Sequence, residues 1–531
     1  MGTHGYLAYR YKGRYFVYYH HFDSDPGCLG VEALREIPRN VSKEQFEQWA
    51  RVTRENLEAQ FEKTKDESRW SRSDYTTDKQ PLNIDDIQWV YEIDFDNLIF
   101  HVNAQPMFRL DNLPPSKIFL KSISYDHFGH TALRENTPVQ FRYDWRAPPP
   151  PPSPESLSTY NSCHNRSSTS SMHDLLCVPA ALSSIESART ALVELLVTRC
   201  MAERGIGHRI RILESVPDRD HISKSMLRLA LSLVNFAVGL PIPSLPCIPR
   251  RSSQDFIWIR KDVCLRITTH LDDKENLRAS IGDLVRHINA TQDSDGEVGT
   301  IYGIACSIFH CAFVRVDKDV EGTTSFAHTP ALQFLPSFFA RKISTPGIEA
   351  MSRLGCQATG VEFLATISDA YKLPRITHAG EELSIASSMT TKVPIEVWTR
   401  IGDFLTSPAD LVNLASISPQ ALSAAADLAR CPWVLEFRLV DVVGSVPPIP
   451  ETTESTKDND IGNYFYEMGR AKFTAVRGGH RVNVELGQYD EWSTIGRRHD
   501  TTFEVETYLS GRITQKLYVL EMGDDAKDTD S

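Results

Sequence analysis

The sequence has little that would mark a disulfide-stapled, zinc-binding or membrane-spanning protein. Its 531 residues include ten cysteines, but none forms a C-x-x-C pair, which is typical of reduced thiols. The closest group, Cys306, His310 and Cys311, lacks the paired spacing of a tetrahedral ion site, so no metal is predicted. The longest apolar stretch, Met226–Leu240, contains an arginine and an asparagine and is shorter than the ~20 residues that span a bilayer. It predicts a buried helix.

Signals for targeting, cofactor binding and nucleic-acid binding are also scarce. The opening residues Met1–Tyr6 contain no basic stretch followed by an apolar core, so no secretory signal is predicted. No Walker loop, dinucleotide fingerprint, G-x-S-x-G elbow or H-E-x-x-H helix is present, so no cofactor and no catalytic residue is predicted. The net charge of -12 argues against nucleic acid as a partner.

What the chain does have is enough apolar material for several domains. Hydrophobic residues make up 41% and charged residues 24%, as in soluble globular proteins. The length predicts about three or four domains of ordinary size. We expect a multi-domain α+β protein without membrane contact.

Residues 1–145 predict a mixed α/β N-terminal domain. Two aromatic-rich runs, Tyr6–Tyr11 and Arg14–Tyr19, flank a turn at Lys12-Gly13 and indicate a β-hairpin. A capping box, Ser42 with Gln45, starts an amphipathic helix that reaches position 63. A second hairpin is predicted where Trp89–Phe95 and Leu98–Val102 flank Asp96-Asn97.

A linker and a larger helical region follow. Residues 146–171 contain five consecutive prolines and a Ser/Asn/Thr-rich stretch, which favour an extended spacer. Residues 172–388 are predicted to be mainly helical, with apolar stripes such as the one that runs from Leu277 to Ile288. Within them, the β-branched run Thr300–Asp317 favours a strand.

The segment 392–436 carries the most specific pattern in the chain. Pro394 suits a helix start, and Ser407-Pro408 and Ser418-Pro419 suit the starts of two more helices. Apolar residues in the first of these recur at helical spacing on one side: Val397, Ile401, Phe404 and Leu405. We therefore predict three short helices, too small to bury all their apolar surface among themselves.

This segment resembles the F-box. The matching residues are Pro394, Glu396, Ile401, Phe404, Leu405, Asp410, Leu411 and Leu414, and Pro432-Trp433 lies where the family often ends with an aromatic residue. Two departures are Val393 in place of the leading leucine and Ser418–Leu422 in place of the usual Cys-(Arg/Lys)-x-Trp section. The resemblance implies docking onto the SKP adaptor of a cullin-RING ubiquitin ligase, with the rest of the chain holding a substrate protein.

The candidate residues for helix core and adaptor contact are Val397, Ile401, Phe404, Leu405, Leu411 and Leu414, with Pro394 setting the first helix start. Spacing alone does not decide which of the six face the adaptor and which face each other. Elsewhere, Gly2–Tyr6, His21–Asp23 and Trp258–Cys264 are similar to a group of mushroom-type fungal proteins. That second resemblance implies lineage and supplies no chemistry.

The C-terminal region predicts a β module between two polar segments. Residues 441–460 form a second linker, and 461–522 contain two hairpins that predict a small antiparallel sheet. The first pairs Phe473–Arg477 with His480–Leu486, and the second pairs Phe503–Leu509 with Arg512–Leu520. Residues 523–531 are an acidic tail.

An enzyme is the alternative interpretation of the sequence. His20, His21 and Asp23 could support acid-base chemistry, but neighbours on an extended chain point to opposite faces. A polar turn is the better interpretation, and the His/Asp group Tyr125–His130 is interpreted as a loop. The rival hypothesis is a ligand-binding or hydrolytic N-terminal domain that carries the F-box-like helices as passive structure.

The two hypotheses predict different surfaces. Exposed apolar helix faces at 394–417 favour an adaptor, whereas complete burial of those faces, with a deep His-lined pocket near His21, favours an enzyme. Our expectation is a non-enzymatic, cytoplasmic or nuclear F-box-like adaptor. Its expected partners are an SKP-type adaptor with its cullin-RING ligase and a substrate protein.

Overall fold

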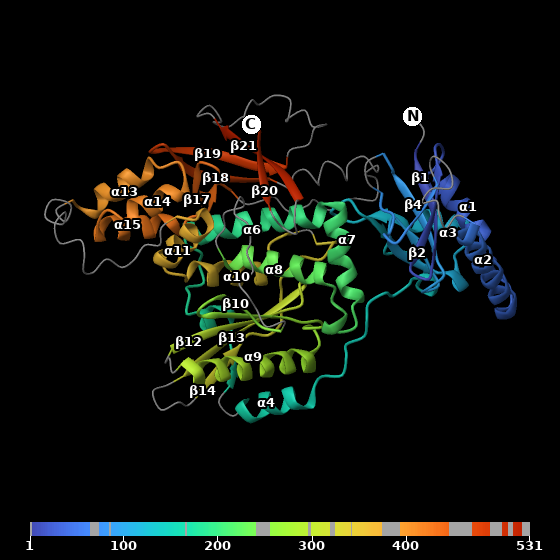
Figure 1. The fold of residues 1–531 in the computed structure, drawn as a ribbon, viewed down its shortest axis with the longest axis horizontal. Helices are drawn as coiled ribbons and strands as arrows, with labels where there is room; N and C mark the ends of the chain where they lie inside the picture. The colour runs from blue at the N-terminus through green and yellow to red at the C-terminus, as the bar shows by residue number, and fades with distance from the viewer. Residues whose placement is uncertain are drawn as a thin grey trace. The chain divides into compact units, whose positions relative to one another are not determined.

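The fold is that of a computed structural model. It describes residues 3–63, 74–83, 86–164, 167–239, 255–295, 299–318, 324–340, 342–373, 393–444, 470–488, 502–507 and 513–522. The protein is mixed α/β, with several sheets, and divides into two compact units (Figure 1). Unit 1 comprises Met1–Ala147 with Cys200–Ser215, and unit 2 comprises Pro148–Arg199 with Val216–Ser531.

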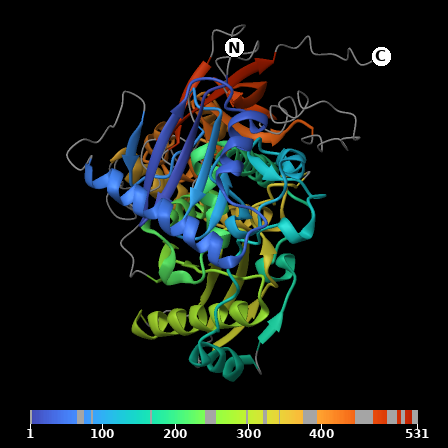
Figure 2. The same ribbon diagram turned by 90° about the vertical axis from the view of Figure 1, so that its right-hand side faces the viewer.

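Unit 1 is built on a six-stranded sheet in the order β3-β2-β1-β4-β5-β6. Its strands are β1 (Gly5–Tyr11), β2 (Arg14–His20), β3 (Tyr75–Thr77), β4 (Trp89–Asp94), β5 (Ile99–Val102) and β6 (Gln105–Arg109). The helices that pack on one face are α1 (Val31–Glu36), α2 (Lys43–Lys63) and α3 (Ser116–Ser122). Figure 2 shows α2 crossing these strands. The apolar core of unit 1 lies between these helices and the sheet.

The local signals in unit 1 produce the predicted elements. The β1–β2 hairpin turns at Lys12 and Gly13, both with positive φ, and their amides donate to the Asp96 carboxylate at 2.7 and 2.9 Å. At the start of α2, Ser42 and Gln45 exchange two hydrogen bonds of 3.0 and 3.3 Å, which confirms the capping box. The second predicted hairpin is confirmed as β4 and β5.

A second face of unit 1 is polar. The helix α7 (Arg204–Ile212) supplies Arg211, which donates to the Gln105 amide oxygen at 2.9 Å and pairs with the Asp126 carboxylate. Asp126 lies between β7 (Ile123–Tyr125) and β8 (Thr131–Leu133) and also accepts from the His130 amide. Its contacts are therefore those of a structural turn.

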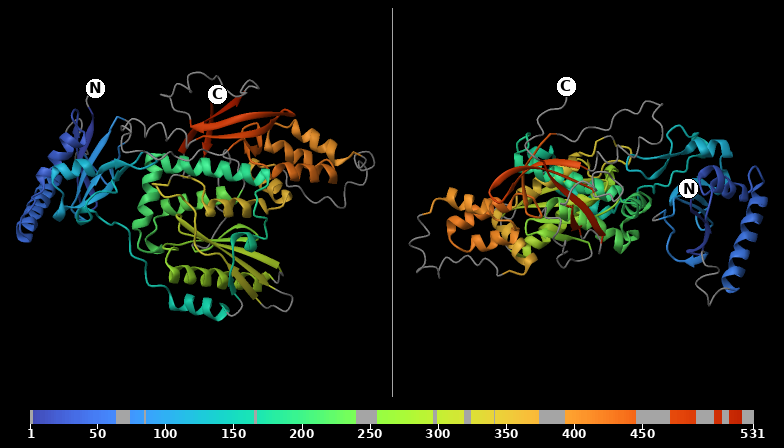
Figure 3. Two further views of the ribbon diagram at one scale, coloured as in Figure 1. Left: turned by 180° about the vertical axis from the view of Figure 1, so that it is seen from behind. Right: turned by 90° about the horizontal axis from the view of Figure 1, so that it is seen from above.

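Unit 2 contains a sheet in the order β10-β11-β12-β13-β14-β9, with β15 paired to β13. Its strands are β9 (Ser167–Thr169), β10 (Ile257–Arg260), β11 (Val263–Ile267), β12 (Gly299–Cys306), β13 (His310–Lys318), β14 (Thr324–His328) and β15 (Leu332–Gln333). On one face lies α9 (Lys274–Asp295) with α4 (Pro154–His164) beside it. On the other lie α8 (Lys224–Val238) and α10 (Pro346–Cys356) (Figure 3).

Two sequence predictions for this region contain fewer strands and helices than the structure has. The middle region has more helical than strand residues, but a sheet also runs through it, which the helical pattern does not indicate. The segment predicted as a spacer forms α4 and the edge strand β9, and the run at Thr300–Asp317 is a hairpin of β12 and β13 instead of one strand. The predicted buried helix is confirmed as α8, whose apolar side is buried. Among the described residues, no helix is long and apolar enough to cross a membrane.

The C-terminal sheet is antiparallel, in the order β16-β17-β18-β19-β21-β20. Its strands are β16 (Trp433–Val434), β17 (Phe437–Val442), β18 (Arg470–Arg477), β19 (His480–Gln488), β20 (Thr502–Thr507) and β21 (Ile513–Met522). Both predicted hairpins are present, as β18–β19 and β20–β21. β16 and β17, which follow the three-helix segment, extend the sheet. The acidic tail and most of the second linker lie outside the described residues.

Candidate partner-binding surface

The segment that resembles an F-box folds as three short helices. They are α13 (Ile395–Asp403), α14 (Pro408–Ala415) and α15 (Pro419–Ala429). Pro394 directly precedes α13, Ser407 caps α14 by accepting from the Ala409 amide at 3.2 Å, and Ser418 caps α15 by accepting from the Ala421 amide at 3.1 Å. The three predicted helix starts are therefore confirmed.

The inner sides of these helices form one core with a helix from earlier in the chain. Leu411 and Leu414 of α14 are buried against α15, Trp398 of α13 and α11 (Gly360–Tyr371). Gly402 lets α13 approach α15 closely, since a Cβ there would collide with the Leu428 side chain. Leu411 and Leu414 thus stabilise the three-helix segment from within.

The outer side of α13 is left open. Val397 is 45%, Ile401 41% and Phe404 56% exposed, and the three lie at i, i+4 and i+7, so they share one stripe of the helix. Ile395, at the start of α13, is 36% exposed. Single exposed apolar residues are ordinary, but a continuous stripe of them is typical of an interaction site.

The structure thus divides the seven residues selected from the sequence. Val397, Ile401 and Phe404 define what we call the α13 stripe, while Leu411 and Leu414 are core residues. Of the remaining two, Leu405 is half-buried against the same core, and Pro394 is exposed at the helix start.

The sequence pattern did not select one residue of the exposed surface, Ile395, and one residue of the core, Trp398. Trp398 is 7% exposed and anchors α13 inward, and Ile395 extends the open side. Trp398, Gly402 and Leu405 recur at i, i+4 and i+7, a second stripe beside the first. The spacing of Trp398, Gly402 and Leu405 is the signal in the sequence that could have found the buried side of α13. It does not decide the matter, because either of the two adjacent stripes could be the buried one.

The end of α13 is fixed to the C-terminal sheet. The Asp403 carbonyl accepts from the Gly479 amide at 2.8 Å, and the Asp403 carboxylate pairs with Arg438, which is 3% exposed. Gly479 has φ +82° and lies against the Phe404 ring, where an added Cβ would come within 2.5 Å of a ring carbon. The Arg400 guanidinium lies 5.8 Å from the centre of that ring. These contacts hold the exposed phenylalanine on a rigid base.

The aromatic residue at the end of the F-box-like segment and the departure at Ser418–Leu422 are also built into the core. Trp433, in β16, is 1% exposed and packs in the same cluster as Trp398. Residues 418–422 form the cap and first turn of α15, in which Ala421 is buried. Ser418–Leu422 therefore helps to hold α15 in the core, and the other departure, Val393, is partly buried against the same core.

The candidates weighed for an enzyme do not converge. The His21 ring lies 3.0 Å from the Tyr19 hydroxyl and stacks on His4 at 4.7 Å, and both His21 and Asp23 are exposed. Asp23, next to a buried serine, adopts a positive φ of 53°. This is the polar turn that the sequence favoured.

The cysteine group fares no better as a metal site. Cys306 and Cys311 face each other across the β12–β13 hairpin, where burial raises the pKa of the Cys306 thiol to about 12. Burial also raises the pKa of Cys311 and lowers that of His310. Because cysteine binds a metal as the thiolate, the raised pKa values of Cys306 and Cys311 disfavour metal binding by these two thiols.

No family model, no curated protein and no solved structure matches the chain.

Proposed function

We propose that this protein is an F-box-like adaptor, which docks through the α13 stripe onto an SKP-type adaptor of a cullin-RING ubiquitin ligase. The observation that carries the proposal is the open stripe itself. Val397, Ile401 and Phe404 face solvent on a helix whose other side is firmly packed. In this role the protein acts in the cytoplasm or nucleus as a non-catalytic subunit.

The size and setting of the stripe suit a helical partner. Full burial of a valine, isoleucine or phenylalanine side chain contributes about 1.5–3 kcal/mol, so a partner that covers the rest of three such residues gains a few kcal/mol. Glu396 and Arg400 are exposed beside the stripe and provide a charged rim. An apolar centre with a charged rim is the usual arrangement of a protein interface.

In this proposal the buried side of the three-helix segment stabilises α13, and the exposed side of α13 binds the partner. The α14 and α15 core keeps the geometry of α13 constant, and the anchor of Asp403 on Gly479 and Arg438 fixes its end. A substrate protein would then be held by other parts of the chain, and the adaptor would bring it to the ligase. Docking onto a rigid face avoids the entropy cost of ordering the helix at the moment of binding.

The test is binding of the full chain to a purified fungal SKP-type adaptor, measured by calorimetry and size-exclusion chromatography. The wild-type chain should form a stoichiometric complex. The double variant Ile401→Asp with Phe404→Asp should lose it, because two charges would be buried without partners. Phe22→Asp, at an exposed phenylalanine of unit 1, is the matched control and should bind normally.

Two results would refute the proposal. One is the absence of any complex between the wild-type chain and the adaptor. The other is full binding by the double variant, since this would place the interface elsewhere. Circular dichroism of each variant confirms that the fold is retained, so a loss of binding reports the surface and not unfolding.

A further inference from the structure

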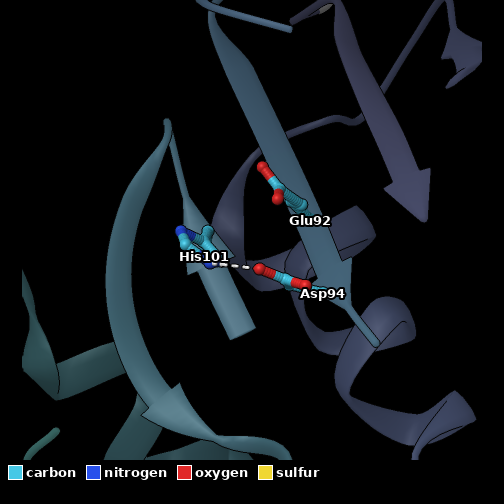
Figure 4. A group of neighbouring side chains, drawn as sticks. All are labelled: Glu92, Asp94 and His101. Atoms are coloured by element: carbon cyan, nitrogen blue, oxygen red, sulfur yellow. Dashed lines mark ion pairs between the residues drawn. The ribbon is translucent and has the colours of Figure 1, made fainter. Parts of the chain in front are cut away.

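A buried acidic and imidazole cluster lies in unit 1, whereas the α13 stripe belongs to unit 2. Glu92 and Asp94 are on the same face of β4, and His101 is directly opposite Glu92 on β5 (Figure 4). The residues that alternate with them on β4, Tyr91 and Ile93, belong to the apolar core of unit 1. The three polar side chains thus share the other face of the sheet.

These side chains are withdrawn from water, and Glu92 and His101 keep polar atoms without a hydrogen-bond partner, whereas both oxygens of Asp94 accept hydrogen bonds. Glu92 and Asp94 are 0% exposed and His101 is 8% exposed. One Glu92 carboxylate oxygen, Oε1, and both ring nitrogens of His101 lack a hydrogen-bond partner. The contact from His101 Nε2 to Asp94 Oδ2 is 3.6 Å, too long for a hydrogen bond. Buried polar atoms without partners are costly and point to a missing ligand.

The three side chains lie close together. One donor atom from each side chain lies within 4.8 Å of the others, the only such group of three His, Cys, Asp or Glu side chains in the described part of the chain. Ligands at about 2.1 Å from one zinc ion are ~3.4 Å apart in a tetrahedron. Small side-chain rotations would therefore close this cluster around an ion.

A second layer of hydrogen bonds orients the two carboxylates. Gln80 Nε2 donates to Glu92 Oε2 at 2.9 Å, and Glu92 Oε1 has no hydrogen-bond partner. Asp94 accepts from Arg10 at 3.1 Å and from the Asn97 side chain at 2.8 Å. Outer partners of this kind fix ligands in metal sites and tune their affinity.

We propose that Glu92, Asp94 and His101 bind a divalent first-row transition-metal ion, with Zn²⁺ as the best match. One imidazole nitrogen and two carboxylate oxygens form the mixed donor set that zinc accepts, whereas Mg²⁺ and Ca²⁺ prefer oxygen alone. Arg10 already pairs with Asp94 at 3.1 Å, so the carboxylate charge left for an ion to balance is that of Glu92. Water or a further group would complete the coordination.

A proton is the competing occupant. Burial lowers the pKa of His101, but the charges of Glu92 and Asp94 outweigh it and raise that pKa above its ordinary value. A protonated His101 held between two carboxylates is therefore the arrangement that the metal would replace. The experiment must separate these two states.

The test uses the full chain, carried on a tag without histidine and treated with a chelator before Co²⁺ is added. The expected result is a visible absorption band of bound Co²⁺ without the intense thiolate-to-cobalt band that cysteine ligands would give. Zn²⁺ should abolish this band by competition and should raise the unfolding temperature of the wild-type chain. About one ion per chain should bind.

Variants locate the site. Glu92→Gln keeps the shape of the side chain and its partner Gln80. Glu92→Gln and His101→Asn, each made as a single variant, should remove the Co²⁺ band and the Zn²⁺-dependent rise in unfolding temperature. His221→Asn is the matched control, because His221 pairs with Asp218 at 2.7 Å on the surface but has no third ligand. It should leave both signals unchanged.

Any of three outcomes would overturn the site: no metal-dependent signal in the wild-type chain, a thiolate-type spectrum, or signals that survive both Glu92→Gln and His101→Asn. The first of these leaves the protonated imidazole as the occupant. Should a variant fail to fold, the wild-type Co²⁺ spectrum alone still decides whether a nitrogen and oxygen site exists.

Discussion

Leucine and phenylalanine truncations in the three-helix segment should have opposite effects on stability and on partner binding. Leu411 is 0% exposed in the core with Trp398, so Leu411→Ala should cost about 3 kcal/mol of local stability. Phe404 is 56% exposed, so Phe404→Ala should cost only about 1 kcal/mol, since less than half of its burial energy is lost. At the partner surface the order reverses, because only Phe404 has area left to bury.

Hydrogen exchange measured on peptides from α13 to α15 suits this comparison. The chain has two compact units, so one global unfolding curve would mix their transitions. At tenfold per 1.4 kcal/mol, Leu411→Ala should speed exchange of these peptides about 150-fold and Phe404→Ala about fivefold. Leu414→Ala should behave like the first variant and Val397→Ala like the second.

Equal acceleration by Leu411→Ala and Phe404→Ala would refute the division of the segment into core and stripe. So would a Leu411→Ala chain that exchanges at the wild-type rate. Peptides from unit 1 serve as the internal control, because their exchange should be unaffected by either substitution.

Three further substitutions test contacts that shape unit 2. Arg438→Met removes the buried partner of Asp403 and should cost about 3 kcal/mol, seen as faster hydrogen exchange in α13 and β17. Gly479→Ala forces a left-handed residue against a ring of α13 and should cost about 1–2 kcal/mol in the same assay. Arg353→Met removes a fully buried guanidinium 3.3 Å from Glu186 and should lower the urea midpoint of unit 2. Burial raises the pKa of Glu186, but hydrogen bonds at the start of α6 (Ser184–Ala202) and the Arg353 charge outweigh burial and lower that pKa. The stability that the Arg353–Glu186 pair contributes is therefore complete above the ordinary pKa of Glu186 and is lost as pH falls through the lowered pKa. A urea midpoint independent of pH across that range would contradict the assignment.

Local signals predicted the N-terminal elements because they act over short distances. The capping box of Ser42 and Gln45 and the turn at Lys12-Gly13 need only neighbours in sequence. The same holds for the hairpin at Asp96-Asn97. A two-residue loop there already places Glu92 opposite His101, so the sequence contained the signal for the buried cluster.

The sheet of unit 2 could not be predicted in this way. Its strands pair with distant segments, as β9 does with β14, and its parallel pair β11–β12 is joined through α9. The turn between β12 and β13 was also hidden, because Ile308 adopts a positive φ of 72°, which a β-branched residue rarely does. Apolar runs of this kind give no turn signal.

The candidate surface was predicted in its residues but not in its orientation. Helical spacing selects stripes, and α13 has two of them side by side. Only the packing of Trp398 on α11 and α15 decides which stripe turns inward. That packing depends on a helix from earlier in the chain, which no local pattern reveals.

The most direct test of the account is the affinity of the full chain for a purified SKP-type adaptor, measured for the wild-type chain, Phe404→Ala and Phe22→Ala. The account predicts a complex that Phe404→Ala weakens at least about tenfold, as expected for an aromatic anchor at an interface, and that Phe22→Ala leaves unchanged. A wild-type chain that does not bind, or equal affinities for all three proteins, would contradict it.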